Sequence, residues 1–221
     1  MIAVDIDRNH PTQVLTKAWH FAFGGPSGAS PLVQNGVVYF DGSGLNPGDD
    51  GQPHLFAVTE QNVNGSLQPQ LLWSKNDING NVQASFAVDP RGGFWSFGVG
   101  SGTLERRSMT TGAILTSINV TSLLGQRGTY SPSSAITIAG PASQPVMLVG
   151  AIAAQSVAIP FRRSWVMAID LNTSGLLWKV RVDNSDHQLD FTSTQFAVTQ
   201  ASNPIVVFSS QLQGARAIGL P

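Results

Sequence analysis

The amino-acid sequence predicts an all-β protein. Apolar runs of four to seven residues, rich in Val, Ile, Phe and Leu, are separated by Gly, Pro, Asn and Asp along the chain, which is the pattern of strands joined by turns. No stretch of a dozen residues carries an apolar stripe of helical spacing that is free of Gly and Pro. A third observation, a repeat of about 50 residues, predicts how the strands are grouped.

The repeat is clearest in AIDLNTSGLLW, residues Ala168–Trp178, where an apolar strand meets Asp, turns through Thr-Ser-Gly and returns to end in Trp. Weaker copies lie at Ala3–Trp19, Ala57–Trp73 and Leu104–Thr116, and the last of these has Thr in place of Trp. The repeat anchors, which are the positions that correspond across the copies, are spaced about 50 to 60 residues apart. They are Ala3, Ala57, Arg106, Ala168 and Ala217.

A second hairpin precedes each of the four later anchors. In Ser30–Phe40 two apolar strands flank Asn-Gly, a strong hairpin signal, and residues 84–97, 134–149 and 194–208 follow the same plan. One repeat therefore consists of two hairpins, that is, four antiparallel strands, which is the blade of a β-propeller. We expect a single repeat domain over residues 1–221 with about four such blades.

The unit Ala-x-Asp-x-x-Thr-Gly-x-x-x-Trp resembles the repeat of the quinoprotein-type (PQQ-like) β-propeller family. The resemblance is sharp at Ala168–Trp178, where Ser174 is one residue extra. In that family the Trp wedges between neighbouring blades, so the resemblance implies a structural docking role for Trp19, Trp73 and Trp178. Propellers of the family usually have seven or eight blades, and about four repeats therefore imply an incomplete propeller or a fragment of a larger ring.

Quinone-dependent dehydrogenases of this family hold PQQ and calcium on the propeller axis, with a catalytic Asp, a stacking Trp and a pair of adjacent cysteines. This chain has no cysteine, and no Asp in it matches the family's catalytic or calcium-binding positions with any specificity. We therefore expect no catalytic residue and no PQQ or other cofactor, and the protein is predicted not to be an enzyme. A fragment of a PQQ-dependent oxidoreductase remains the alternative.

The loop Asp41–Gly51 is the best candidate for a metal site. Its residues Asp41, Asn46, Asp49 and Asp50 carry the hard oxygens that Ca²⁺ prefers. The spacing and the closing Glu of an EF-hand are missing, however, and Asp, Asn and Gly are also the usual turn formers. The competing interpretation is a hairpin tip without metal.

Three further features are expected to be structural. Asp170 is predicted to cap its turn through local hydrogen bonds, and Gly112 and Gly175 are predicted to occupy turn positions with positive φ. The aromatic run Phe94–Phe97 could form a carbohydrate platform, but alternation of side chains along a strand favours packing between blades.

Composition excludes several partners. The net charge is −1 and only 11% of residues are charged, so the sequence predicts no basic surface for nucleic acid. The longest uncharged run is interrupted by prolines, so we do not expect it to form a membrane-spanning helix. No signal peptide is visible at the N-terminus, while a polar surface of Ser, Thr, Asn, Gln and Gly favours an extracytoplasmic location. The predicted function is a non-enzymatic binding or scaffold module for a protein partner, with carbohydrate binding as a further alternative.

Overall fold

The structure is a computed structural model. It describes residues 2–5, 16–24, 29–43, 53–78, 82, 84–125, 128–153, 164–182, 196–199, 205–210 and 214–219. Almost all regular structure in these ranges is antiparallel β, arranged in five sheets.

The sheets are numbered here in chain order. Sheet 1 contains β1 (Ile2–Asp5) and β2 (Thr16–His20); sheet 2 contains β3 (Leu32–Gln34), β4 (Val37–Ser43), β5 (Pro53–Val63) and β6 (Ser66–Lys75); sheet 3 contains β7 (Ala87–Val88), β8 (Phe94–Phe97), β9 (Thr103–Arg107) and β10 (Ile114–Asn119); sheet 4 contains β11 (Tyr130–Pro132), β12 (Thr137–Ala139), β13 (Val146–Ala153), β14 (Ser164–Asp170) and β15 (Gly175–Arg181); sheet 5 contains β16 (Ala197–Val198), β17 (Ile205–Ser210) and β18 (Gly214–Gly219).

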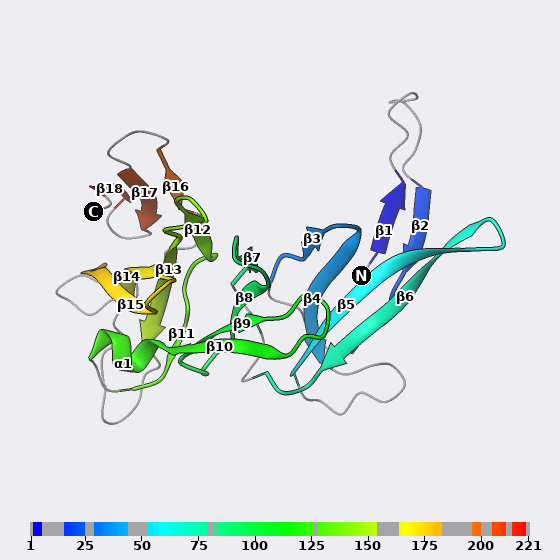
Figure 1. The fold of residues 1–221 in the computed structure, drawn as a ribbon, viewed down its shortest axis with the longest axis horizontal. Helices are drawn as coiled ribbons and strands as arrows, with labels where there is room; N and C mark the ends of the chain where they lie inside the picture. The colour runs from blue at the N-terminus through cyan, green and yellow to red at the C-terminus, as the bar shows by residue number, and fades with distance from the viewer. Residues whose placement is uncertain are drawn as a thin grey trace.

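Sheets 2 and 3 are four-stranded meanders in which every strand pairs with its neighbour in the sequence. Sheet 4 follows the same plan, except that its first strand is split into β11 and β12, which both pair with β13. Sheets 2, 3 and 4 follow one another along the long axis of the molecule, and sheets 1 and 5 lie on the same side of this row, above its right and left ends in Figure 1. The fold is therefore an all-β, open array of propeller-type blades, as the sequence predicts.

The strand register places the repeat anchors at equivalent points of their sheets. Between the last two strands of each sheet, Ala3 pairs with Trp19 in sheet 1, Ala57 with Trp73 in sheet 2 and Ala168 with Trp178 in sheet 4. In sheet 3 the corresponding pair is Arg106 with Thr116. A break in register, the signature of a β-bulge, lies next to each of these four pairs.

Apolar clusters fill the seams between consecutive sheets, because a blade with two apolar faces must bury both against neighbours. We call the face of a sheet that carries its anchor the forward face. The forward face of sheet 2 packs against Phe86 and Phe94 of the next repeat, and that of sheet 4 packs against Val206 and Phe208 of sheet 5. A cluster around Phe40, Phe56 and Trp19 joins sheets 1 and 2, and the largest cluster joins sheets 3 and 4.

Most of the residues expected at turn positions with positive φ have positive φ in the structure. Asn35-Gly36 and Asn64-Gly65 both have two successive positive φ angles, as type I′ hairpins require. Gly112 has φ 69° as expected, whereas in the other predicted turn Ser174 (φ 58°), and not Gly175, takes the positive φ. The expectation for Gly175 is wrong, because the extra residue Ser174 shifts the turn by one position.

The helical content of the described chain is small. Helix α1 (Val120–Leu124) is capped by the Asn119 side chain, which accepts from the Ser122 N–H, and ends at Gly125 in the left-handed conformation. None of the helices in the described ranges is long and apolar enough to cross a membrane.

Candidate functional site

Tryptophan 73 closes the seam between sheets 2 and 3. Its indole Nε1 donates to the Met109 carbonyl at 2.9 Å, and its ring stacks on Phe94 with a centroid distance of 6.4 Å and an interplanar angle of 6°. The Tyr39 hydroxyl donates to the same carbonyl at 3.3 Å. One backbone acceptor of sheet 3 is thus held by two side chains of sheet 2.

Tryptophan 19 makes the analogous contact one seam earlier. It is 6% exposed, and its Nε1 donates to Oε2 of Glu60 in sheet 2 at 2.7 Å. Glu60 lies three residues after the anchor Ala57, and Met109 lies three residues after the anchor Arg106. In both seams the Trp of one sheet therefore donates to the third residue after the anchor of the next sheet.

In the seam between sheets 3 and 4, the hydrogen-bond acceptor is again the third residue after the anchor, but the donor is not a Trp. Sheet 3 has Thr116 at the Trp position, and the residue three after the anchor Ala168 is Leu171. The Leu171 carbonyl accepts a hydrogen bond from Nη1 of Arg91, in the turn between β7 and β8. A guanidinium from sheet 3 thus occupies the donor role that Trp19 and Trp73 have elsewhere.

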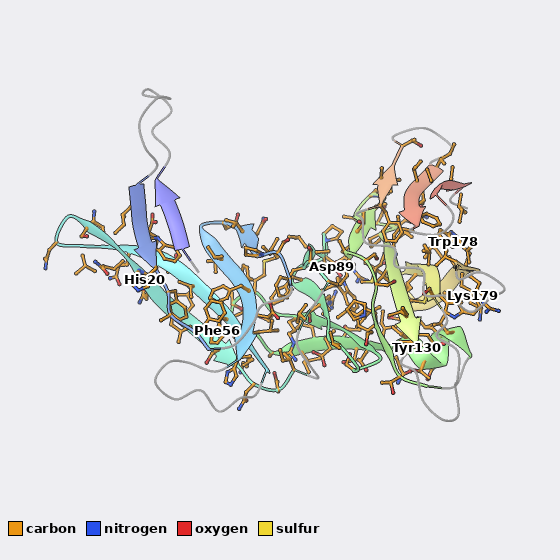
Figure 2. The ribbon with its side chains drawn as sticks, turned by 180° about the vertical axis from the view of Figure 1, so that it is seen from behind. His20, Phe56, Asp89, Tyr130, Trp178 and Lys179 are labelled. Carbon is orange, nitrogen blue, oxygen red and sulfur yellow. The ribbon has the colours of Figure 1, made fainter. Side chains whose placement is uncertain are left out.

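Asp89 fixes the orientation of this arginine. Its Oδ1 accepts from the Arg91 backbone N–H at 2.8 Å and from Nε at 2.9 Å. Its Oδ2 accepts from Arg91 Nη2 at 2.7 Å and from Trp95 Nε1 at 2.8 Å, with Arg106 Nη1 at 3.6 Å. The Asp89 side chain is fully buried and lies near the middle of the row of sheets, between Phe56 on one side and Tyr130 and Trp178 on the other (Figure 2).

The electrostatics of Asp89 favour the ionised form. Burial alone raises the pKa of Asp89, but hydrogen bonds from Arg91 and Trp95 outweigh it and lower the pKa from 3.8 to about 2. The same pairing raises the pKa of Arg91. The Asp89 carboxylate therefore stays ionised near neutral pH, where it holds Arg91 in place and is unsuited to exchange protons.

A second arginine joins sheets 2 and 3. Arg107 is fully buried and donates from Nη2 and Nε to Glu105 Oε2 at 2.6 and 3.1 Å. Its Nη1 reaches Asp77 Oδ1 at 2.7 Å and the Gly112 carbonyl at 3.0 Å, and Nη2 also reaches the Asp77 carbonyl at 3.2 Å. Asp77 follows β6, so the guanidinium ties the exit of sheet 2 to the third strand of sheet 3.

An exposed leucine recurs at the same strand position in three of the sheets. In sheets 2, 3 and 4 the bulge on the last strand leaves one residue without a register partner, immediately before the Trp or Thr position. That residue is Leu72, Leu115 or Leu177, and these side chains are 47%, 50% and 42% exposed. We call these three residues the rim leucines. The corresponding bulge residue of sheet 1 is Ala18, which is partly buried.

The predicted metal residues are described only in part. Asp41 is fully buried, and its Oδ2 accepts from the Val82 N–H at 3.1 Å, which is a structural contact. Asn46, Asp49 and Asp50 lie outside the described residues. Within the described ranges, no three His, Cys, Asp or Glu residues gather in a way that could hold a metal ion.

Two other predicted features are settled by contacts. Asp170 accepts from the Asn172 N–H at 2.9 Å and from the Thr173 hydroxyl at 2.8 Å, which confirms its turn-capping role. Phe94, Trp95 and Phe97 are fully buried, so they pack between blades and offer no carbohydrate platform.

Trp178 is the third predicted docking residue. Its ring packs against the cluster between sheets 4 and 5, and Nε1 is buried with no hydrogen-bond acceptor among the residues that the structure describes. The third residue after the last anchor, Leu220, lies outside those residues. A docking role for Trp178 equivalent to that of Trp19 and Trp73 stays a prediction.

The sequence reasoning missed Asp89, Arg91, Arg107 and the rim leucines. One signal was present: in the third copy Arg106 replaces the anchor Ala and Thr116 replaces Trp together. The loss of the indole donor at this seam, together with an arginine at the anchor, predicts a polar substitute there. The rim leucines depend on the bulge, which shifts by one residue the alternation expected for a regular strand.

Comparison with known proteins adds distant structural similarity. Neither a family model nor a curated protein matches this chain. A europium-containing methanol dehydrogenase is similar over 76% of this chain and 27% of its own, with 17% identity and a TM-score of 0.49. The GH43 protein BlXynB from Bacillus licheniformis is similar over 94% of this chain and 45% of its own, with 11% identity and a TM-score of 0.41. This chain therefore spans less than half of either structure.

Proposed function

We propose that this protein is a non-enzymatic scaffold of propeller-type blades that binds a protein partner through the rim leucines. Isolated exposed apolar residues are ordinary on protein surfaces. Leu72, Leu115 and Leu177 differ because each occupies the same bulge position in its sheet, and each is at least 42% exposed. This regular placement of solvent-facing leucines is the observation that carries the proposal.

The charged groups support a structural role for the interior. Asp89 and Arg91 connect sheets 3 and 4, and Arg107 connects sheets 2 and 3. These strongly hydrogen-bonded groups support the seams, and the Asp89 carboxylate is held ionised near neutral pH by Arg91 and Trp95. No observation on the described residues favours the PQQ-dependent oxidoreductase or the carbohydrate-binding alternative.

The test replaces all three rim leucines with Asp and compares the variant with Val33→Asp. Val33 is 63% exposed on β3, so it is a matched apolar-to-charged change away from the rim. Cross-linking in cells of the source organism, followed by mass spectrometry, should map partner cross-links to β6, β10 and β15. Titration of the purified partner should then show affinity lowered about tenfold or more by the triple variant and unchanged by Val33→Asp. Equal binding by all three proteins would refute the proposal.

A further inference from the structure

Two hairpins of sheet 2 turn through Asn-Gly. Asn35-Gly36 joins β3 to β4 and Asn64-Gly65 joins β5 to β6, and all four residues are exposed with positive φ. A Cβ on either glycine would meet nothing within 4 Å, so neither turn is crowded. An Asn before Gly is prone to deamidation, because glycine has no side chain to hinder attack by its backbone nitrogen on the Asn carboxamide. The third Asn-Gly pair of the chain, Asn79-Gly80, lies outside the described residues.

Deamidation needs only water as a co-reactant. The glycine nitrogen gives its proton to solvent and bonds to Cγ of the Asn, ammonia leaves, and a cyclic succinimide forms. Water then opens the ring at either carbonyl and leaves Asp or isoaspartate, in which the main chain runs through Cβ and Cγ and is longer by one atom. Nothing is oxidised or reduced, and the rate depends on how free the glycine N–H is to lose its proton.

The two glycine N–H groups differ in this respect. Gly65 donates to Oδ1 of Asn62, three residues earlier, at 2.9 Å. The residue three before Gly36 is Val33, which has no side-chain acceptor, and no other acceptor for the Gly36 N–H lies among the described residues. The same turn type therefore has a restrained nitrogen at Gly65 and a free one at Gly36.

The turn at Gly36 holds the short strand β3 in place. The Thr59 hydroxyl donates to the Gly36 carbonyl at 3.1 Å, and the three residues of β3 pair with β4, ending at Gln34 opposite Val37. Leu32 of β3 packs against the cluster that joins sheets 2 and 3. An additional main-chain atom at position 35 is incompatible with keeping both this register and the hydrogen bond from Thr59, so isoaspartate there loosens β3.

We propose that Asn35 is a site of spontaneous deamidation, at which the protein converts to a form with Asp or isoaspartate and, in the isoaspartate product, a loosened β3. Asn64, in the same type of turn, is protected by the bond between Asn62 and Gly65. Asn35 follows the first strand of sheet 2, whereas the rim leucine Leu72 lies on its last strand. The inference therefore does not depend on the proposed role in protein binding.

The experiment incubates the whole chain in mildly alkaline buffer at constant temperature. Chymotrypsin cleaves after aromatic residues such as Tyr39 and Phe56, so its peptides separate positions 35 and 64, and mass spectrometry measures the conversion of carboxamide to carboxyl at each. We expect conversion at Asn35 to be about fivefold faster than at Asn64, the factor that corresponds to one ordinary hydrogen bond. In urea the two positions should convert at similar rates, because Gly follows both.

The Asn62→Ala variant tests the cause of the difference. It should raise the rate at Asn64 to that at Asn35 and leave the rate at Asn35 unchanged. Conversion in the folded wild type that is as fast at Asn64 as at Asn35 would overturn the inference, and so would an unchanged rate at Asn64 in Asn62→Ala.

Hydrogen exchange tests the consequence for β3. Amides of the β3–β4 hairpin should exchange faster in aged wild type than in fresh protein. The control is Asn35→Gly, which cannot deamidate at this position and tolerates positive φ, so its hairpin should exchange at the same rate before and after ageing. Equal exchange in fresh and aged wild type, at substantial conversion to isoaspartate, would refute the loosening of β3.

Discussion

Asp89→Asn isolates the charge at the seam between sheets 3 and 4. The wild-type carboxylate is buried, accepts from Arg91 and Trp95, and has a pKa of about 2 in place of 3.8. A group whose pKa is lowered by folding stabilises the native state above its unfolded pKa and loses this contribution as the pH falls through the folded pKa. Each pKa unit corresponds to 1.36 kcal/mol, so Asp89 contributes about 2 kcal/mol above pH ~5, and this is lost by pH ~2.

Asparagine cannot ionise, so the variant lacks this pH dependence. At pH 6 we expect it to be less stable than the wild type by roughly 3 kcal/mol, because Arg91 is left without its counter-charge. The difference should shrink by about 2 kcal/mol between pH 5 and pH 2. Urea unfolding followed by far-UV circular dichroism at several pH values measures the free energy of unfolding for both proteins.

Arg91→Met and the double variant complete a thermodynamic cycle. The coupling free energy between Asp89 and Arg91 should be favourable at pH 6 and decline in parallel with protonation of Asp89. A stability difference between wild type and Asp89→Asn that stays constant from pH 6 to pH 2 would show that the carboxylate is not held ionised by its partners. The reasoning about this seam would then be wrong.

The remaining predictions concern the seam between sheets 2 and 3. Gly112 has φ 69°, and a Cβ there would lie 2.8 Å from the Trp73 ring, whereas Gly36 has φ 75° and open space around it. In thermal unfolding, Gly36→Ala should lower the free energy of unfolding by about 1 kcal/mol and Gly112→Ala by roughly 1–3 kcal/mol more. Equal losses for the two variants would contradict the close contact between Gly112 and Trp73. Arg107→Met should lower the free energy of unfolding by about 3–5 kcal/mol because Glu105 is left buried without its charge partner, and a loss under about 1 kcal/mol in urea titration would show that the ion pair does not hold the seam.

The sequence was sufficient for the fold class because the signals that define it are local. Apolar runs, Asn-Gly turns and the return to Trp lie within single hairpins, and the aligned anchors fall at equivalent register positions in the structure. The donor to Leu171 could not be predicted in the same way. Arg91 lies 80 residues from Leu171 in the sequence. It stands in the turn between β7 and β8, which the repeat motif does not include. Only the packing of sheet 3 against sheet 4 brings the two residues together.

The seam between sheets 3 and 4 has a different hydrogen-bond donor from the two seams before it, although the acceptor keeps its position in the repeat. The acceptor stays at the third residue after the anchor: it is the side-chain carboxylate of Glu60 in sheet 2 and the backbone carbonyl of Met109 and of Leu171 in sheets 3 and 4. Loss of the indole at Thr116 removes both an N–H donor and the ring that requires a small anchor. The guanidinium of Arg91 restores the donor, and the space at the anchor admits Arg106, whose charge lies 3.6 Å from Asp89. A buried carboxylate becomes necessary once these cations replace an apolar ring, since unpaired buried charges are costly. The substitutions at this seam are therefore one coupled change, and replacing Thr116 by Trp alone should destabilise the protein, because the ring would meet Arg106 where the other sheets have Ala.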